Sequence, residues 1–452
     1  MSTAATPDPY VELGARMSGR VLRPGSDAYD AARRIHNGMI DRRPCAIAQC
    51  TGTADVLEAV NFARRHGMAV TVRGGGHSAA GHCIADDALM IDLSTMKGVH
   101  VDPVQRTARA APGVLLGEFD RETQVYGLAT TMGTVRATGI SGLALGGGVG
   151  WLSRRFGHSC DNMLSADVVT ADGRVLRASA TENEDLFWGL RGGSGNFGVV
   201  TSMEFRLHPV RNVIGGLLGH PREKARDVFR FQLETMRAAP DELTAHVALL
   251  TTPEGHAATG IACCYSGAPE NADKVLGPVR QFGPPLMDMV GEMPYCQLQS
   301  MLDPMFSPGM RNYWTGGYIE RMTDEAVDAL VEATGTIPSP YSAVLLEYHG
   351  GAAGRIAPNA NAFPHRSAEC LLIIMSIWAD PAADEEHMGW ARRLWKAMEP
   401  YSSGAAYSNL LGIDDLGRSR GAFGSNYERL AALKKKYDPD NFFCHNQNIA
   451  PA

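Results

Sequence analysis

Three glycine-rich segments lie in the first half of the chain and indicate where a ligand binds. They are Arg73-Gly74-Gly75-Gly76-His77-Ser78, residues 139–150 and residues 192–198. Because glycine has no Cβ, such segments let the backbone approach a ligand closely and present N–H donors to an anion. One segment alone would indicate a tight turn or helix packing. Three together favour a site for a long ligand that carries a pyrophosphate.

The third segment contains Gly193-Ser-Gly195-Asn-Phe-Gly198, which fits the GxGxxG pattern of dinucleotide sites. That motif must open a helix, but the β-branched run 199–201 follows it and predicts a strand. We therefore exclude a Rossmann site. The sequence also contains no GxxxxGKS or GxxxxGKT, which excludes a P-loop nucleotide hydrolase. Cys263–Cys264, and His158 with Cys160, fit no zinc spacing, so we expect buried thiols and no metal site.

Composition narrows the class of protein further. The 452 residues suggest two or three domains, and 44% hydrophobic with 20% charged residues is normal for a globular protein. The net charge of −7 and the absence of a long basic run argue against nucleic-acid binding. No stretch is apolar enough for a membrane span, and Met1–Tyr10 has no features of a secretory signal. Nine cysteines without a CxxC pair are typical of a reducing cytoplasm.

Hydrophobic periodicity predicts a mixed α+β pattern in two regions. In the first region, up to about residue 210, helices are expected at 54–65 and 114–126, and strands at 68–72, 89–93, 107–110 and 197–207, with a hairpin around Asp172–Gly173. The second region holds predicted helices at 223–236 and 324–333 and strands at 247–251, 312–318, 342–348 and 371–377. A helix at 425–436 is expected in the tail.

Four segments carry a resemblance to a known family. They are Val72-Arg-Gly-Gly-Gly-His77-Ser, Gly142-Leu-Ala-Leu-Gly-Gly-Gly-Val-Gly-Trp151, the run from Asp185 to Val199, and the tail from Tyr437 through Asn446-Gln-Asn448-Ile. In this order they resemble the berberine-bridge-enzyme-like FAD-linked oxidases of the vanillyl-alcohol-oxidase superfamily. Within it the chain looks most similar to bacterial 6-hydroxynicotine-oxidase-like and natural-product tailoring members.

The resemblance implies a PCMH-type FAD-binding domain made from residues 1–212 and a C-terminal segment, 416–452, that returns to it. A substrate domain, residues 213–415, would carry an antiparallel sheet covered by helices. FAD is the implied cofactor, bonded covalently through His77.

The resemblance also implies which residues hold the FAD. The alternative for His77 is an ordinary loop histidine. The implied FAD-binding positions are Arg73, Gly74, Gly75, Gly76, His77, Ser78, Val135, Thr138, Gly139, Ser141, Gly142, Gly198, Val199, Asn446 and Asn448.

Two positions near the expected flavin decide how many covalent bonds hold the flavin and whether oxygen can reach it. Many family members attach the flavin a second time through a cysteine, but the matching residue here is Val135, so a single bond is expected. Cys83 is the nearest alternative, outside the motif position. Thr138 matches the position that lines oxygen access, and its modest size resembles the oxidase state. The alternative is that Thr138 simply packs under the ring.

Proton transfer and substrate binding have several candidate residues. Alternation in the strand 342–348 puts Glu347 and His349 on one face, either toward the flavin or toward helices or solvent. Tyr407-Ser-Asn409 resembles the family's Tyr-x-Asn segment, although Leu410 replaces the aromatic residue that commonly follows. Tyr407 is therefore a further candidate base and Asn409 a substrate contact. Trp314 and Tyr318 would stack on a flat substrate or else belong to the core.

The resulting hypothesis is an FAD-dependent oxidase that takes a hydride from a small-molecule metabolite, as in secondary metabolism, and passes electrons to molecular oxygen. Three alternatives stay open: an oxygenating tailoring enzyme, a dehydrogenase with another acceptor, and a flavin-holding or metabolite-binding protein without turnover. We expect a monomer or homo-oligomer with no nucleic-acid or membrane partner.

Overall fold

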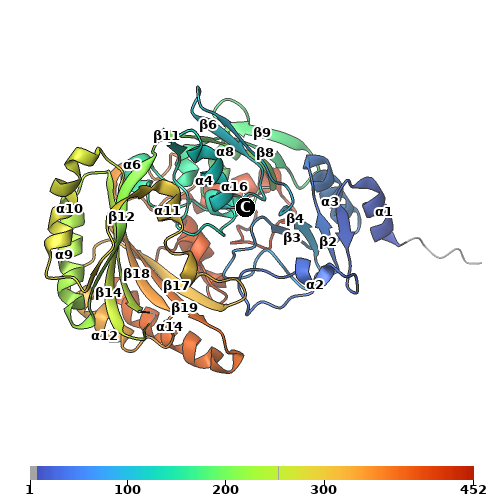
Figure 1. Ribbon diagram of the computed structural model, residues 1–452. Helices are drawn as coiled ribbons and strands as arrows, with labels where there is room; N and C mark the ends of the chain where they lie inside the picture. The colour runs from blue at the N-terminus through green and yellow to red at the C-terminus, as the bar shows by residue number, and fades with distance from the viewer. Residues whose placement is uncertain (1–7, 253) are drawn as a thin grey trace, which may run out of the picture.

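The computed structural model describes residues 8–252 and 254–452, so most of the N-terminal stretch considered above, residues 1–7, lies outside the described residues. The chain forms two small sheets and a two-stranded pair in its first half, and one large sheet in its second half. Figure 1 shows the large sheet on one side and the smaller sheets on the other, with the C-terminus returning between them. No helix of residues 8–252 and 254–452 is long and apolar enough to cross a bilayer.

The first small sheet has the order β1-β2-β4-β3, and β2, β4 and β3 run parallel. Its strands are β1 Arg20–Leu22, β2 Ala46–Gln49, β3 Val70–Arg73 and β4 Leu89–Asp92. Helix α3, Thr53–Arg65, connects β2 to β3 and buries its apolar face against them. Gly67, with φ +62°, reverses the chain after this helix, a conformation that glycine adopts without strain.

The second small sheet is antiparallel and has the order β5-β6-β10-β8-β9. Its strands are β5 Val99–Asp102, β6 Thr107–Ala110, β8 Met163–Val169, β9 Val175–Ser179 and β10 Val199–Arg206. The predicted strands at 107–110 and 197–207 and the hairpin at Asp172–Gly173 are confirmed. A short pair, β7 Leu128–Ala129 with β11 His208–Pro209, lies beside it.

The large sheet is antiparallel and has eight strands in the order β15-β12-β14-β13-β18-β19-β17, with β16 also paired to β12. The strands are β12 Asn212–Pro221, β13 Leu243–Thr251, β14 Ala257–Tyr265, β15 Met287–Asp288, β16 Gly291–Pro294, β17 Arg311–Ile319, β18 Ala343–Tyr348 and β19 Cys370–Trp378. The four strands predicted between 247 and 377 are all present, most of them longer at one or both ends.

One face of the large sheet is covered by helices, as Figure 1 shows for α9, α10, α12 and α14. These helices are α9 Ala225–Ala238, α10 Ala272–Gln281, α12 Asp324–Thr334 and α14 Asp384–Met398. Alternate strand residues such as Val247, Val344 and Leu372 form one core with Phe229 and Leu394 of the helices. Because side chains alternate along a strand, the other half of the strand residues must face the opposite way, toward the small sheets.

The remaining helices are short, apart from the tail helix. They are α1 Pro9–Arg16, α2 Tyr29–Ala32, α4 Leu116–Gln124, α5 Ile140–Leu145, α6 Ser153–Phe156, α7 Ser159–Asn162, α8 Glu184–Leu190, α11 Tyr295–Gln299, α13 Gly351–Gly354 and α15 Ser419–Phe423. The tail helix α16, Tyr427–Tyr437, packs against α8. Gly189 permits this close packing, since a Cβ there would lie 2.3 Å from Leu433 Cδ2.

Candidate active site

A cavity of about 400 Å³ lies between the glycine-rich segments and the uncovered face of the large sheet. We call its two sides the glycine wall, from residues 74–78, 133–145, 194–200 and 443–447, and the sheet wall, from strands β12, β13, β14, β17, β18 and β19. The sequence-predicted residues that line it are Gly74, Gly75, Gly76, His77, Ser78, Val135, Thr138, Gly139, Ser141, Gly142, Gly198, Val199, Trp314, Glu347, Tyr407, Asn409 and Asn446.

The glycine wall depends on direct contact between backbones. A Cβ on Gly75 would lie 2.5 Å from Gly139 Cα, and a Cβ on Gly139 would lie 2.4 Å from Gly75 N. The segments that follow β3 and precede α5 therefore touch without any side chain between them. By contrast, a Cβ on Gly142 or Gly195 would meet nothing within 4 Å, although both residues line the cavity. That open space is the room a bound ligand needs.

His77 lies inside the cavity with its imidazole enclosed by aromatic rings. It stacks on His36 with ring centroids 4.0 Å apart, and Trp314 lies 6.1 Å away on the opposite wall. Burial, helped by His36, lowers the pKa of His77 to about 3, so the ring is neutral. Its Nε2 has no hydrogen-bond partner. A neutral imidazole keeps a lone pair, which suits a residue that forms a covalent bond to carbon.

The C-terminal tail completes the glycine wall and is held by a buried ion pair. Lys434 Nζ lies 2.7 Å from Asp438 Oδ2, and both side chains are fully buried. The same ammonium donates to the carbonyls of Asn196 and Phe443, 2.8 and 2.9 Å away. Burial lowers the pKa of Lys434, and the pairing with Asp438 opposes that change. The pair thus ties the tail to the loop 193–198, next to Asn446.

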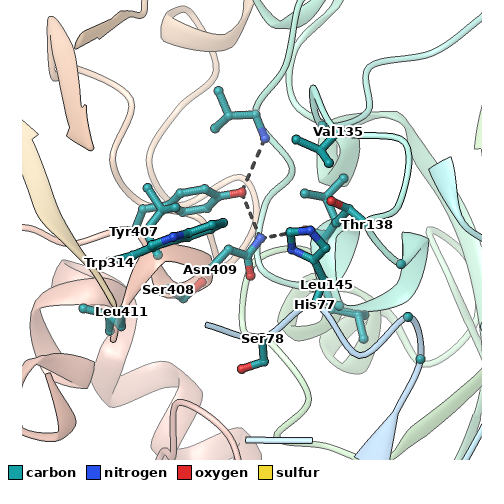
Figure 2. Close-up of a pocket in the computed structure, with 18 of the residues that line it drawn as sticks. His77, Ser78, Val135, Thr138, Leu145, Trp314, Tyr407, Ser408, Asn409 and Leu411 are labelled. Atoms are coloured by element: carbon teal, nitrogen blue, oxygen red, sulfur yellow. Dashed lines mark hydrogen bonds between the residues drawn. The ribbon is translucent and has the colours of Figure 1, made fainter. Parts of the chain in front are cut away.

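Tyr407 presents its hydroxyl to the loop after α5, as Figure 2 shows. Its oxygen accepts from Gly148 N at 2.8 Å, from Asn409 Nδ2 at 2.9 Å and from Val149 N at 3.4 Å. Gly148, with φ +82°, aims its N–H at this oxygen. Burial raises the pKa of Tyr407, whereas these three donors lower it. Burial outweighs the donors, so the pKa stays above its usual value, but the three hydrogen bonds stabilise a phenolate when one forms.

Strand register explains the layout of the sheet wall. The cavity-facing residues Leu250, Ala343, Met375 and Trp314 are cross-strand partners and form one row. Ala248, Leu345 and Ile373 form the next row, two residues further along each strand. The third row contains Leu217, Ala262, His246 and Glu347. The first two rows are apolar except for one indole N–H, and the third holds an ionisable pair.

Burial controls the charge of the third row. Burial raises the pKa of Glu347 to about 7, and the side chain is 7% exposed. Burial, with the nearby His349 and Arg154, lowers the pKa of His246 to about 3, so this imidazole is neutral. Trp151, from the motif Gly142–Trp151, lies 5.2 Å from the His246 ring. These groups form a polar end within an otherwise apolar wall.

Four predicted site residues do not line the cavity. The Arg73 guanidinium turns away and pairs with Asp92 at 2.6 Å, because a buried carboxylate requires a partner. His349 follows the end of β18 beyond the cavity lining, with its ring 5.8 Å from His158, and burial and Arg154 lower its pKa to about 4. Tyr318 is fully buried with its ring 5.6 Å from His349. Asn448 lies further along the tail, with Oδ1 buried and without a partner.

Several cavity residues were missed by sequence reasoning. His246 and Trp151 line the cavity, and His36 stacks on His77. The alternation in β13 carried a signal for His246, since it shares a phase with Ala248 and Leu250. In the part of the chain that the structure describes, no three His, Cys, Asp or Glu side chains lie together as metal ligands. All nine cysteines are free thiols.

Two family models match the chain: "FAD binding domain" over residues 44–179 and "Berberine and berberine like" over residues 406–450. An FAD-linked oxidoreductase from Dictyostelium discoideum is 30% identical over 445 residues, which cover 97% of this chain and 96% of the relative. The chain belongs to the berberine-bridge-enzyme-like family of FAD-linked oxidoreductases. This confirms the predicted family and its mixed α+β fold, FAD as the cofactor, and an enzyme as the class of protein.

Two oxidases illustrate the similarity. The crystal structure of 6-hydroxy-D-nicotine oxidase from Arthrobacter nicotinovorans has a TM-score of 0.89 at 28% identity, covering 96% of this chain and 98% of that one. A chitooligosaccharide oxidase structure has a TM-score of 0.86 at 26% identity, covering 98% and 100%. The chain is therefore an FAD-linked oxidoreductase of a family that contains oxidases, and it shares their fold over at least 96% of its length.

Proposed function

We propose that this enzyme is an FAD-dependent oxidase that removes a hydride from a small-molecule metabolite and uses molecular oxygen as the electron acceptor. One observation carries the proposal: Tyr407, with its oxygen addressed by three N–H donors, lies on one side of the cavity, and His77, Val135 and Thr138 lie on the other (Figure 2). When bound, FAD supplies the hydride acceptor and the route for electrons to oxygen. The surrounding residues must then bind the substrate and take up its proton.

We propose that the FAD is held by a single covalent bond through His77. Val135, which offers no nucleophile, lines the cavity at the position where other family members place a cysteine. Cys83 also lines the cavity, but burial raises its pKa to about 11 and keeps it a thiol. The backbone of residues 74–78 and 139–142 would cradle the pyrophosphate, with residues 1–212 and 416–452 forming the FAD domain and 213–415 the substrate domain.

We assign the proton acceptor to Tyr407. To take up a proton it must be a phenolate, and hydrogen bonds from Gly148, Val149 and Asn409 stabilise that anion against the effect of burial. The apolar rows of the sheet wall exclude water from this exchange. Thr138 leaves space beside the expected flavin for oxygen.

The mostly apolar sheet wall favours a metabolite of secondary metabolism as the substrate. Nine free cysteines favour a reducing compartment such as the cytoplasm.

Anaerobic mixing tests the proposed oxidase activity. The protein is mixed with panels of small alcohols, phenols and amines, and the absorbance of the bound flavin is followed. We expect one class to bleach the flavin and air to restore the colour with release of hydrogen peroxide. Bleaching without recovery in air would show a dehydrogenase with another acceptor. Labelled oxygen in the organic product would show an oxygenase, and no bleaching with any class would leave a binding protein.

A further inference from the structure

The third row of the sheet wall contains an unpartnered polar cluster. His246 and Glu347 are direct cross-strand partners of β13 and β18, so their side chains leave the sheet side by side. Trp151 reaches the same place from the loop after α5 and lies beside His246. All three residues line the cavity. The cluster therefore combines groups from the sheet and from the loop between α5 and α6.

The hydrogen-bonding groups of this cluster are buried but not satisfied within the protein. Trp151 and His246 are 1% and 3% exposed, and neither Trp151 Nε1 nor either ring nitrogen of His246 has a partner. Buried polar groups are normally paired, because an unpaired donor or acceptor away from water destabilises the fold. Three such atoms on residues that line one cavity therefore indicate a ligand that supplies the missing partners.

The charge of the cavity limits what that ligand is. Among the described residues, none of those lining the cavity is a lysine or an arginine. Its titratable groups are Glu347, Tyr407 and Cys83, with the histidines His77, His82, His246 and His445. The histidine next to Glu347 is neutral, so a carboxylate or phosphate placed in the third row would meet no cation and would approach a carboxyl group.

We propose that the third row binds a neutral hydroxyl group of the substrate, and that the apolar body of the substrate lies along the first two rows toward Trp314 and His77. The hydroxyl hydrogen is donated to Glu347, and the hydroxyl oxygen accepts from Trp151 Nε1. His246 supplies a second donor or acceptor. This inference rests on the proposed function, because it assigns the glycine wall to FAD and leaves the sheet wall for the substrate.

The indole N–H decides between a hydroxyl and an ammonium group. An ammonium pairs well with Glu347 but has no lone pair for Trp151 Nε1, which would stay unpartnered. A hydroxyl has both a hydrogen and lone pairs, so it satisfies both neighbours at once. The enzyme therefore selects phenols or alcohols with an apolar skeleton over acids, phosphate esters and amines that lack a hydroxyl.

Binding measurements on the purified, FAD-containing protein test this selectivity. Calorimetric titration with 2-naphthol, 2-naphthoate and 2-naphthamidine compares a hydroxyl, an anion and a cation on one skeleton, none with an oxidisable carbon beside the ring. We expect 2-naphthol to bind roughly tenfold more tightly than either of the others, as loss of about one good hydrogen bond predicts. Equal or tighter binding of the anion or the cation, or no binding of any probe, would overturn the proposal.

Two tryptophans of the cavity provide a matched pair of variants. Trp151→Phe removes the indole N–H beside the third row. We expect the affinity for 2-naphthol to fall roughly tenfold, while the affinities for the other two probes change little. Trp314→Phe removes an equally unpartnered N–H from the first row, where we expect all three probes to change alike. An unchanged order of affinities in Trp151→Phe contradicts the proposal.

Glu347→Gln gives a second test that keeps the shape of the site. At pH 8, where Glu347 is ionised, we expect the variant to bind 2-naphthol within about threefold of the wild type and to bind 2-naphthoate more tightly, because the like charge is removed. No gain for 2-naphthoate contradicts the proposal. Binding is measured without turnover, so the two hypotheses fail separately: expected selectivity in a protein that oxidises nothing overturns only the oxidase proposal, and wrong selectivity in an active oxidase overturns only the hydroxyl site.

Discussion

The glycine wall and the sheet wall enclose one cavity but are built by different means. The glycine wall depends on backbone-to-backbone contact, as between Gly75 and Gly139, and on a tail fixed by the Lys434–Asp438 pair. The sheet wall depends on side chains, which strand register places in rows. A backbone wall has little freedom to vary and suits a constant cofactor. A side-chain wall can change one residue at a time and suits a substrate that differs between relatives.

Tyr407→Phe tests whether Tyr407, whose hydroxyl contacts the loop after α5, is the proton acceptor. We expect flavin reduction under anaerobic conditions to slow by about 100-fold or more, since the proton acceptor is lost. Reduction by the wild type should speed up as the pH rises and more phenolate forms, and the variant should lose this dependence. Tyr318→Phe removes a buried hydroxyl outside the cavity and should leave the rate unchanged. A wild-type rate in Tyr407→Phe would contradict the assignment.

Lys434→Met tests whether the buried ion pair between Lys434 and Asp438 holds the C-terminal tail in the glycine wall. The change leaves Asp438 buried without its cation, so we expect the free energy of unfolding to fall by about 3–5 kcal/mol. Denaturant titration measures this fall, and the variant should also retain less FAD. Lys435→Met, one residue along the same helix and exposed, is the control and should change neither quantity. Equal stability of the two variants would show that the tail is held by other contacts.

Glu347→Gln tests the electrostatics of the sheet wall through pH. Burial raises the pKa of Glu347 to about 7 in the fold, so the protein gains stability from the bound proton at low pH and loses it as the pH rises from about 4.5 to about 7. The variant lacks this loss, so at pH 8 it should be more stable than the wild type by about 3 kcal/mol at most. If the stability of the two proteins changes equally with pH, the raised pKa of Glu347 is contradicted.

Two glycine variants sharpen the distinction within the glycine wall. Gly75→Ala places a Cβ against Gly139, so we expect thermal unfolding to show a loss of about 1–3 kcal/mol. Gly142→Leu projects into open space, so the fold should keep its stability while the fraction of protein that carries FAD falls. Full FAD loading of Gly142→Leu would show that the cofactor does not occupy this space.

The same difference explains which features were predictable from sequence. The glycine wall was recognisable because backbone geometry requires glycine at fixed positions, and all of residues 74–78 line the cavity. Arg73 was misplaced because its partner Asp92 is opposite it in a parallel pair, a contact that only topology reveals. A charged residue inside the buried run 89–93 was the available signal, since a buried carboxylate needs a partner.

The sheet wall was only partly predictable, because it combines strands that are far apart in the chain. Alternation gave the correct phase for Glu347 but could not show that His246 stands beside it. His349 packs on Tyr318, whose strand phase is that of Trp314, but it lies outside the cavity lining because β18 ends at Tyr348 and the chain turns through Gly350 and Gly351, both with positive φ. Strand register and strand ends are set by the whole sheet and not by the local sequence.

The mass of the acid-denatured protein tests the central claim most directly. If FAD is bonded through His77, the precipitated polypeptide stays yellow, its mass exceeds that of the chain by one FAD, and the modification maps to the peptide that contains His77. His77→Ala should then give a colourless precipitate with free FAD in the supernatant. A colourless wild-type precipitate of unmodified mass would contradict the covalent site.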